Sequence, residues 1–474
     1  MTMETESPPS RPHRTASSVV LYPAMIGATC LVTWAVNVAG RSLVAPARAA
    51  EAAAGRAASS GSDVLLHVLI ALIVVIVAAR ALGAVCRRLH QPAVIGEVVA
   101  GIALGPSLLG RVAPDVMHAL LPASVAPYLS IIAQLGVILF MFLVGLHLDL
   151  SQVRSKVHAT VAISHASILL PFALGCVLAL WLYPRLSTSD VPFTAFALFV
   201  GVSLSVAAFP VLARILTDRG LQGTRMGTIA LTCAAVDDVT AWCLLAVVIA
   251  VAKAEVSGAI ITLLSTGVYL AGMLLVVRPL VITTVHAAGK RAVNSQTVMS
   301  VAVVGLLLST LATEAAGIHA IFGAFLLGAI IPHDSAVAQT LTRNLEDVVI
   351  VLFLPAFFAF TGMRTEIGLV SSPAEWLICA LIVLIATVGK FGGSFVAARL
   401  SGFSRRDATS LGILMNTRGL MELIVLNLGL DLHILSPTLF TMLVLMAVVT
   451  TLATTPVLDF VTARPAVRGA QATV

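Results

Sequence analysis

The chain has 474 residues, of which 59% are hydrophobic and only 11% are charged, with 28 Lys and Arg against 22 Asp and Glu. This composition is typical of a protein that crosses the membrane many times, and it argues against a soluble enzyme. Basic runs with interleaved aromatic residues do not occur in the sequence, so nucleic acid is not expected as a partner.

The first apolar stretch, at about 18–42, has two interpretations. Two arginines precede it, and residues 47–49 (Ala-Arg-Ala) supply a small-residue site of the signal-peptidase type. The run that follows is rich in Ala, Gly and Ser, which is typical of a flexible linker. We therefore expect 1–62 to be an N-terminal leader and linker, the leader being either a signal peptide or signal-anchor, or a permanent extra helix.

Thirteen further apolar stretches predict membrane-spanning helices, because about 20 residues at about 1.5 Å each cross the hydrocarbon layer. No stretch alternates in polarity as the strands of a barrel would. The predicted fold class is an all-α polytopic membrane protein, with a transmembrane domain at 63–461 and a short tail at 462–474. The ranges are approximately 64–85, 93–110, 128–148, 158–183, 192–217, 226–252, 258–285, 297–313, 317–332, 347–363, 374–399, 407–430 and 437–461.

Lys and Arg are distributed unevenly between alternate loops. Seventeen of them fall in one set of loops and only four in the other, namely Arg111, Arg185, Lys253 and Arg364. Since cytoplasmic loops carry the excess of positive charge, the thirteen spans should begin outside and end inside. The C-terminus is then cytoplasmic, and the plasma membrane is the expected location.

Two adjacent aspartates, Asp237 and Asp238, lie in an otherwise uncharged stretch at 226–251. Each carboxylate costs on the order of 3 kcal/mol inside a membrane on insertion scales. Nothing about folding requires two such groups, so the pair predicts a role in handling ions or protons. Adjacent helical residues point about 100° apart, so one acid can pair with a base while the other faces a water-filled cavity.

Few other ionisable groups are predicted to lie deep in spans. Lys390 has small neighbours that permit a close helix approach. A buried Lys–Asp pair that opens when a cation arrives would release a proton in exchange for the positive charge of the cation. The alternative is an ion pair with a purely structural role. Arg418 and Glu422 are one turn apart, and we favour a structural or gating role for them over direct ion binding. Glu97 begins a glycine-rich helix and is a supporting candidate, whereas His319 is a weaker one.

Two of the predicted spans carry signs of interruption. In the fifth, the hydroxyls of Ser203 and Ser205 precede Pro210, which frees backbone carbonyls. The interruption in the fifth span and the one in the twelfth would each, taken alone, also fit an ordinary helix kink. The two spans are seven apart and therefore run in opposite directions, as expected of inverted repeats whose broken helices meet at the midplane and stabilise ions. The corresponding residues of the twelfth span are Asn416, Thr417 and Gly419.

Four segments of the chain match motifs of a known family. They are QPAVIGEVVAGIALGPSLLG at 91–110, GVILFMFLVGLHLDL at 136–150, AAVDDVTAW at 234–242 and NTRGLMEL at 416–423. By these segments the chain resembles the monovalent cation:proton antiporter-2 family, and most of all the branch with plant cation/proton exchangers. The resemblance implies a sodium/proton antiporter-like fold with a panel-like dimerisation domain, a six-helix core, elevator-type alternating access and a homodimer.

The resemblance also implies roles for the buried charges. In the sodium-exporting relatives, the first aspartate of the pair forms a salt bridge with the lysine, and the second binds the cation or protons. Matched motif to motif, Asp237 would pair with Lys390, and Asp238 would hold the monovalent cation. An Asp-Asp pair accompanies electrogenic exchange in those relatives. No cofactor is expected, because the nucleotide-binding domain of the glutathione-gated relatives has no counterpart in the sequence.

The expected function is that of a secondary active transporter, not an enzyme, that exchanges Na⁺ or K⁺ for H⁺ across the plasma membrane. Its expected partners are these ions, membrane lipid and a second copy of the chain. Two alternatives stay open. A proton-coupled exporter of an organic cation or metabolite would respond to that compound alone, and a passive cation channel would carry cations without coupling to protons.

Overall fold

The computed structural model describes residues 15–46, 61–122, 124–147, 157–219, 221, 224–253, 256–290, 294–316 and 319–462. Within these ranges the regular structure is helical throughout, with no strand, so the prediction of an all-helical fold is confirmed. Most of the predicted linker, at 47–60, and nearly all of the predicted tail, at 463–474, lie outside the described residues.

The chain forms a succession of α-helices, interrupted by single turns of π-helix (η1, η2) and of 3₁₀-helix (η3). In chain order they are α1 (Thr15–Gly40), α2 (Gly61–Arg88), α3 (Ala93–Leu104), α4 (Leu109–Val112), α5 (Pro114–Leu120), α6 (Ala126–His147), α8 (Val157–Leu186), α9 (Phe193–Ser205), α10 (Phe209–Asp218), α11 (Arg225–Lys253), α12 (Val256–Gly272), η1 (Met273–Val277), α13 (Arg278–Lys290), α14 (Ser295–Ala315), α15 (Ala320–Ile330), α16 (Ala336–Val348), η2 (Val349–Phe353), α17 (Leu354–Met363), η3 (Ile367–Leu369), α18 (Pro373–Leu400), α19 (Arg405–Met415), α20 (Leu420–Asp431) and α21 (Pro437–Thr462).

The helices are long and apolar enough for a protein that crosses a membrane many times. Among the described residues, ten helices meet this requirement, or eleven if the bent pair α19 and α20 is one span. Helices α9 and α15 are apolar but shorter, with 13 and 11 residues. Each of the thirteen predicted ranges coincides with a helix or a broken pair, and the number thirteen itself stays a prediction.

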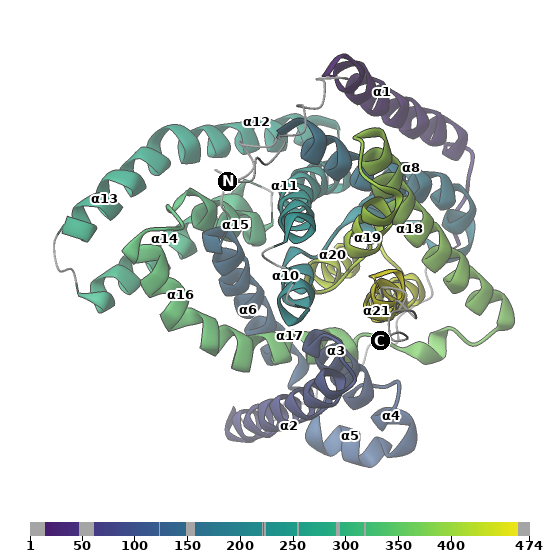
Figure 1. Ribbon diagram of the computed structural model, residues 1–474. Coiled ribbons are helices and arrows are strands. Elements are labelled where there is room, and N and C mark those ends of the chain that lie inside the picture. Colours follow the sequence, from purple (N-terminus) through teal and green to yellow (C-terminus); the bar gives the residue numbers. More distant parts are fainter. Residues whose placement is uncertain are drawn as a thin grey trace, which may run out of the picture.

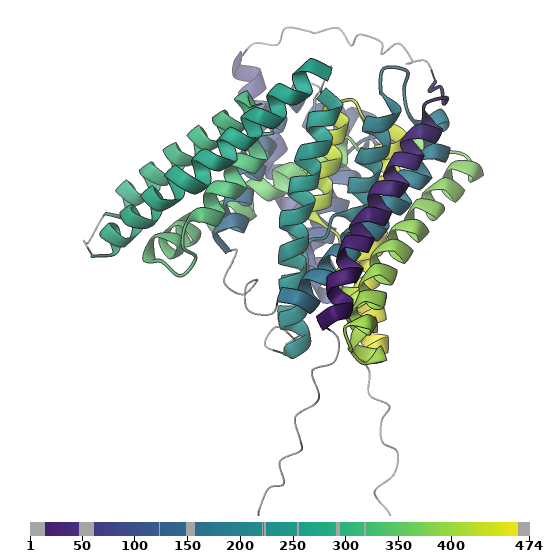
Figure 2. The same ribbon diagram turned by 90° about the horizontal axis from the view of Figure 1, so that it is seen from above.

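The helices fall into two groups (Figure 1). The core bundle contains α8 to α11 and α18 to α21, and in it α8 packs against α9, α11 and α18. The panel contains α2, α3, α6 and α14 to α17, and in it α6 packs against α15 and α17. Helices α12 and α13 extend away from the core bundle, and α1 lies along α8 (Figure 2).

Each half of the core bundle repeats one pattern: a long helix, a broken helix and a second long helix. In the first half, α9 ends at Ser205 and α10 begins at Phe209. In the second half, α19 ends at Met415 and α20 begins at Leu420, with the two axes bent by 42°. Both breaks lie where the sequence predicts an interruption, and the order of helices is that of a duplicated unit.

Glycines set the distance between α3 and α17 in the panel. A Cβ atom on Gly362 would collide with the backbone of Gly101, and one on Gly105 would lie 2.8 Å from the carbonyl oxygen of Gly362. The two helices therefore touch backbone to backbone, which only small residues permit. Gly267 on α12 differs, because no atom lies within 4 Å of the place that its Cβ would take.

We expect Gly362→Ala to lower the midpoint of thermal unfolding in detergent, because overpacking of this kind costs about 1–3 kcal/mol. Gly267→Ala is the matched control. It meets open space and gains up to about 1 kcal/mol of helix propensity, so its midpoint should stay equal or rise. Equal losses in both variants would contradict the close contact of α3 and α17.

Candidate ion site at the two helix breaks

Close packing of α18 on α8 brings Lys390 to the acid pair. Gly389 and Gly393 flank Lys390 on α18, and a Cβ atom on either would collide with α8, at Pro171 and at Ala166 respectively. The backbones can therefore approach closely, as small residues at four-residue spacing allow. As a result the side chain of Lys390 enters the core bundle and is completely buried.

The carboxylate of Asp237, on α11, is bound by three side chains. Ser164 Oγ donates to Oδ1 at 2.5 Å, and Ser167 Oγ donates to Oδ2 at 2.5 Å. Lys390 Nζ lies 3.1 Å from Oδ2, and neither charged group is exposed. Additional hydrogen bonds of this kind offset the loss of hydration in a buried ion pair. Asp237 is thus held in a complete polar network.

Two cations close the C-terminal end of α9. A helix end leaves carbonyl groups without partners and carries a partial negative charge. Arg418 donates to the carbonyl oxygens of Ser203 at 3.0 Å and Leu204 at 2.6 Å. Lys390 Nζ donates to the carbonyl oxygen of Ser205 at 2.5 Å. Both cations come from the second half of the core bundle, so the break in the first half is completed by the second.

Arg418 lies in the break between α19 and α20 and is itself held from two sides. Its Nη1 donates to Glu422 Oε2 at 2.7 Å, and both side chains are fully buried. On α21, Thr451 Oγ1 accepts from the backbone amide of Arg418 at 3.0 Å and donates to its carbonyl oxygen at 2.7 Å. The pair of Arg418 in the break and Glu422 on α20 is therefore one part of a larger network.

The two breaks touch each other. Gly419 directly precedes α20, and a Cβ atom there would meet Val211 of α10 and Ala208 in the first break. Its φ of 172° is extended backbone that any residue adopts, so the need for glycine comes from space and not from conformation. Pro210 lies in the first turn of α10, where its missing N–H removes no ladder hydrogen bond.

Asp238 differs from its neighbour. The residue is only 3% exposed, yet neither carboxylate oxygen has a side-chain hydrogen-bond partner among the described residues. The backbone amide of Phe209, at the start of α10, faces this carboxylate, and a helix N-terminus favours negative charge. Buried acceptors without a partner are uncommon and need an explanation.

More buried oxygens of the two breaks share this property. Together with Asp238 they offer carboxylate, amide and hydroxyl oxygens, which are the ligands that hard cations take. Such a set suits a monovalent cation as cargo. At or beside the two breaks, the further described oxygens without a hydrogen-bond partner are Ser203 Oγ, Asn416 Oδ1, Thr417 Oγ1 and Glu422 Oε1; oxygens of Thr33, Asn37, Gln91 and Ser187, elsewhere in the described ranges, also have none.

Glu97 lies elsewhere. It is a buried residue of α3, in the panel, and it interacts electrostatically with Arg80 and Arg87 of α2. The acid pair, Lys390 and both helix breaks belong to the core bundle. The structure thus brings together most of the predicted site residues and leaves Glu97 in the other group of helices.

Three hydroxyl residues of the network were missed by sequence reasoning. Ser164 and Ser167 are three residues apart and therefore share a helix face. Thr451 lies in a row with Thr450, Thr454 and Thr455, all buried. Hydroxyls repeated on one face of a predicted span were a signal for a polar face, but they did not indicate which residue they contact.

A helical bundle with charges buried at two facing helix breaks defines a membrane transporter of the secondary active class. Residues 68–463 match the family described as "Sodium/hydrogen exchanger, transmembrane". The chain therefore belongs to this family, and it is a transporter and not an enzyme.

Named relatives agree with this assignment. The Na⁺/H⁺ antiporter NhaS4 of Synechocystis is 43% identical over 85% of this chain and 99% of its own length. Cation/H⁺ antiporter 20 of Arabidopsis thaliana is 40% identical over 83% of this chain, and K⁺/H⁺ antiporter 1 of Saccharomyces cerevisiae is 33% identical over 80%. This chain covers 48% of the plant protein and 45% of the yeast protein. The predicted family and its plant-like branch are confirmed.

A solved structure has the same fold. The sodium proton antiporter MjNhaP1 from Methanocaldococcus jannaschii, at pH 8, superposes with a TM-score of 0.61 over 84% of this chain and 96% of that protein. Only 12% of the residues are identical, so the likeness concerns the fold alone.

We expect Arg418→Ala to destabilise the protein by about 3–5 kcal/mol, because it leaves Glu422 as an uncompensated buried charge and frees the carbonyls at the end of α9. Adding Glu422→Gln should restore part of the loss. Arg405, exposed at the start of α19, provides the control, and Arg405→Ala should change stability by less than about 0.5 kcal/mol. Unfolding in detergent measures all three. Equal stability of Arg418→Ala and Arg405→Ala would refute the role of Arg418.

Proposed function

We propose that the chain exchanges a monovalent cation, Na⁺ or K⁺, for H⁺ across the membrane by alternating access. The observation that carries this proposal is the buried carboxylate of Asp238, which has no side-chain partner in the described part of the chain. The family, and relatives that are named Na⁺/H⁺ and K⁺/H⁺ antiporters, support the same reaction.

The charge balance at the breaks favours Asp238 as the carrier. Lys390 is paired with Asp237, and Arg418 is paired with Glu422. Asp238 is the acid of this group that has no salt bridge to a base. A buried carboxylate is unfavourable without compensation, so it is neutralised by either H⁺ or a cation. Because one carboxylate cannot hold both, the two ions compete, and this competition couples their movements.

The residues around Asp238 position it or contribute further ligands for the cation. Asp237 and Lys390 fix the end of α9 beside the carrier. A cation at Asp238 adds positive charge close to Lys390 and weakens its pair with Asp237, which links cation binding to the geometry of the break. Ser203, Asn416 and Thr417 contribute oxygen ligands, and Gly419 allows the two breaks to meet.

The proposal includes the setting of the protein. The core bundle moves against the panel as an elevator, two copies associate through their panels, and lipid covers the remaining apolar surface. The chain lies in the plasma membrane with its C-terminus in the cytoplasm, which the uneven distribution of Lys and Arg supports. Glu97 is assigned a supporting role within the panel.

We expect Asp238→Asn to abolish H⁺ flux driven by Na⁺ or K⁺ in proteoliposomes, because the amide cannot exchange a proton for a cation. The variant should keep the thermal midpoint of the original protein, since the two side chains have the same shape. Asp190→Asn, in the exposed connection between α8 and α9, is the control and should retain full exchange. Undiminished exchange by Asp238→Asn would reject the carrier assignment.

Competition at Asp238 gives a second expectation. Lowering the pH on the side where the cation binds should raise the KM for the cation, by up to about tenfold per pH unit where H⁺ occupies the site. The maximal rate at saturating cation should stay nearly constant. Initial rates with Na⁺, K⁺, Li⁺ and Rb⁺ in turn test this and identify the cargo. A pH-independent KM with a falling maximal rate would contradict competition.

A further inference from the structure

A cavity of about 270 Å³ lies between the core bundle and the panel. Helices α6, α15, α17 and α20 contribute to its wall. Its character changes along α20, because Asn427 and Asp431 are polar whereas Ile424, closer to the break, is apolar. The other polar residues of the wall are Gln134, Glu314 and His319.

In the proposed orientation this cavity opens at the external end of the protein. Helix α21 ends inside, so α20, which directly precedes it, runs outward from the break to Asp431. Polar contacts join the panel to the core bundle here: Arg364 Nη2 lies 2.6 Å from Asp431 Oδ1, and Arg364 Nη1 donates to Asn427 Oδ1 at 3.3 Å. These contacts keep the external ends of the two groups together.

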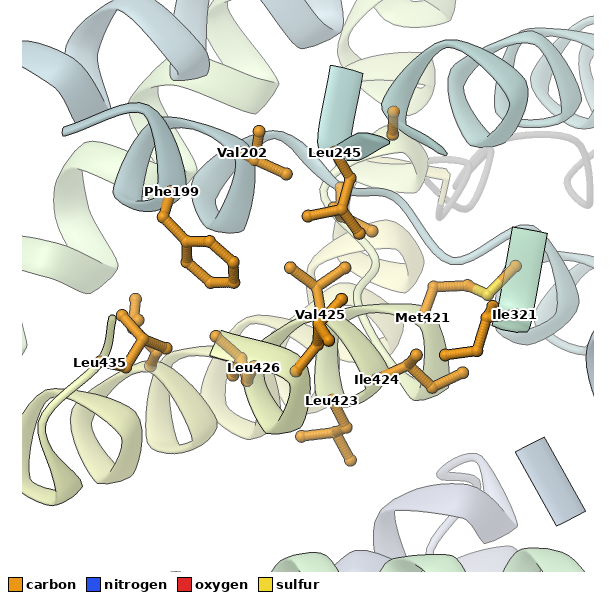
Figure 3. Close-up of a cluster of buried hydrophobic side chains, with 14 of the residues drawn as sticks. Phe199, Val202, Leu245, Ile321, Met421, Leu423, Ile424, Val425, Leu426 and Leu435 are labelled. Atoms are coloured by element: carbon orange, nitrogen blue, oxygen red, sulfur yellow. The ribbon is translucent and has the colours of Figure 1, made fainter. Parts of the chain in front are cut away.

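On both α11 and α20, apolar side chains follow the ion site toward the external end of the protein. On α11, Trp242 comes one helical turn after Asp238, and its ring meets the ring of Phe322 edge-on at 5.5 Å. On α20, Met421 comes between the break and the cavity, and it points toward Ile321, which lines the cavity (Figure 3). Met421 is completely buried, and Trp242 and Ile321 are each 5% exposed.

A second contact extends this layer. Leu245, one further turn along α11, lies against Val425 of α20 (Figure 3), and both are buried. The layer therefore joins three elements, with α11 and α20 from the core bundle and α15 from the panel. We call it the external seal; its residues are Trp242, Leu245, Ile321, Phe322, Met421 and Val425.

We propose that the external seal denies external ions and protons access to Asp238 in this conformation, and that Met421 is a residue on which tight coupling depends. The inference rests on the proposed function. Apolar constrictions exclude water and ions, so H⁺ has no path from the cavity to the carboxylate. Because Ile321 and Phe322 belong to the panel, movement of the core bundle against the panel separates them from Met421 and Trp242 and opens the path.

Proton leak through reconstituted protein tests the proposal. Vesicles with an imposed pH gradient and choline as the only cation should hold the gradient with the original protein. Met421→Ala should speed its decay by roughly tenfold, because the shortened side chain lets water into the seal. Met442→Ala removes an equally buried methionine of α21 outside the seal, and it should stay tight.

In the proposal, the protons that leak through Met421→Ala pass by way of the Asp238 carboxylate. Adding Asp238→Asn to Met421→Ala should therefore return the decay to its original rate. A tight Met421→Ala protein, an equal leak from Met442→Ala, or a leak that survives Asp238→Asn would each overturn the proposal. Cation-driven exchange by the original protein is measured in the same vesicles. Its absence would reject the proposed function, whereas normal exchange with a tight Met421→Ala rejects the seal alone.

Labelling gives a second measurement that does not depend on transport. In a variant without the six native cysteines, Asn427→Cys should react with a membrane-impermeant maleimide added outside, because it lines the cavity. Met421→Cys, one layer deeper, should be protected. Equal labelling of both positions from outside, or labelling of Asn427→Cys from the inside only, would overturn the seal.

Discussion

A helix that is interrupted inside a membrane protein leaves backbone carbonyls that hydrocarbon cannot satisfy, and this constraint organises the core bundle. Arg418 and Lys390 bind the last three carbonyls of α9. Each cation in turn requires a buried counter-charge, which Glu422 and Asp237 supply. Four of the charged groups at the site therefore follow from the geometry of one break, before any transport is considered.

The two adjacent aspartates point in different directions from α11, about 100° apart, and therefore have different partners. Asp237 points toward α8 and α18, where Ser164, Ser167 and Lys390 complete its bonding. Asp238 points instead toward the start of α10, and its two oxygens have no side-chain partner, like Asn416 Oδ1 and Thr417 Oγ1 of the second break. The first acid is fixed by its surroundings, and the second is left able to change its occupant.

Much of this arrangement could be predicted from the sequence, because charges, proline and glycine inside apolar spans have few explanations. The pairing of Asp237 with Lys390 was among the expectations, but its two serine partners were not. A serine in a helix usually bonds a carbonyl of its own preceding turn, as Ser205 does to Gly201, so Ser164 and Ser167 carry no mark of a distant acceptor. The main partners of Arg418 are backbone carbonyls, which have no sequence signature at all. The sequence shows how deep a residue lies in its span but not which helices surround that span. For this reason Glu97 was a candidate beside the residues of the core bundle, although it belongs to the panel.

The two halves of the core bundle are not equivalent in one respect. In each half, a polar side chain of the second long helix faces the backbone of the break in that half. Asp238 of α11 faces Phe209, and Thr451 of α21 bonds to Arg418. One half thus offers an acid and the other a neutral hydroxyl. Under the proposed exchange, the charge carried in one transport cycle is therefore set by the acid on α11, because Thr451 on α21 cannot bind or release a proton in the same way.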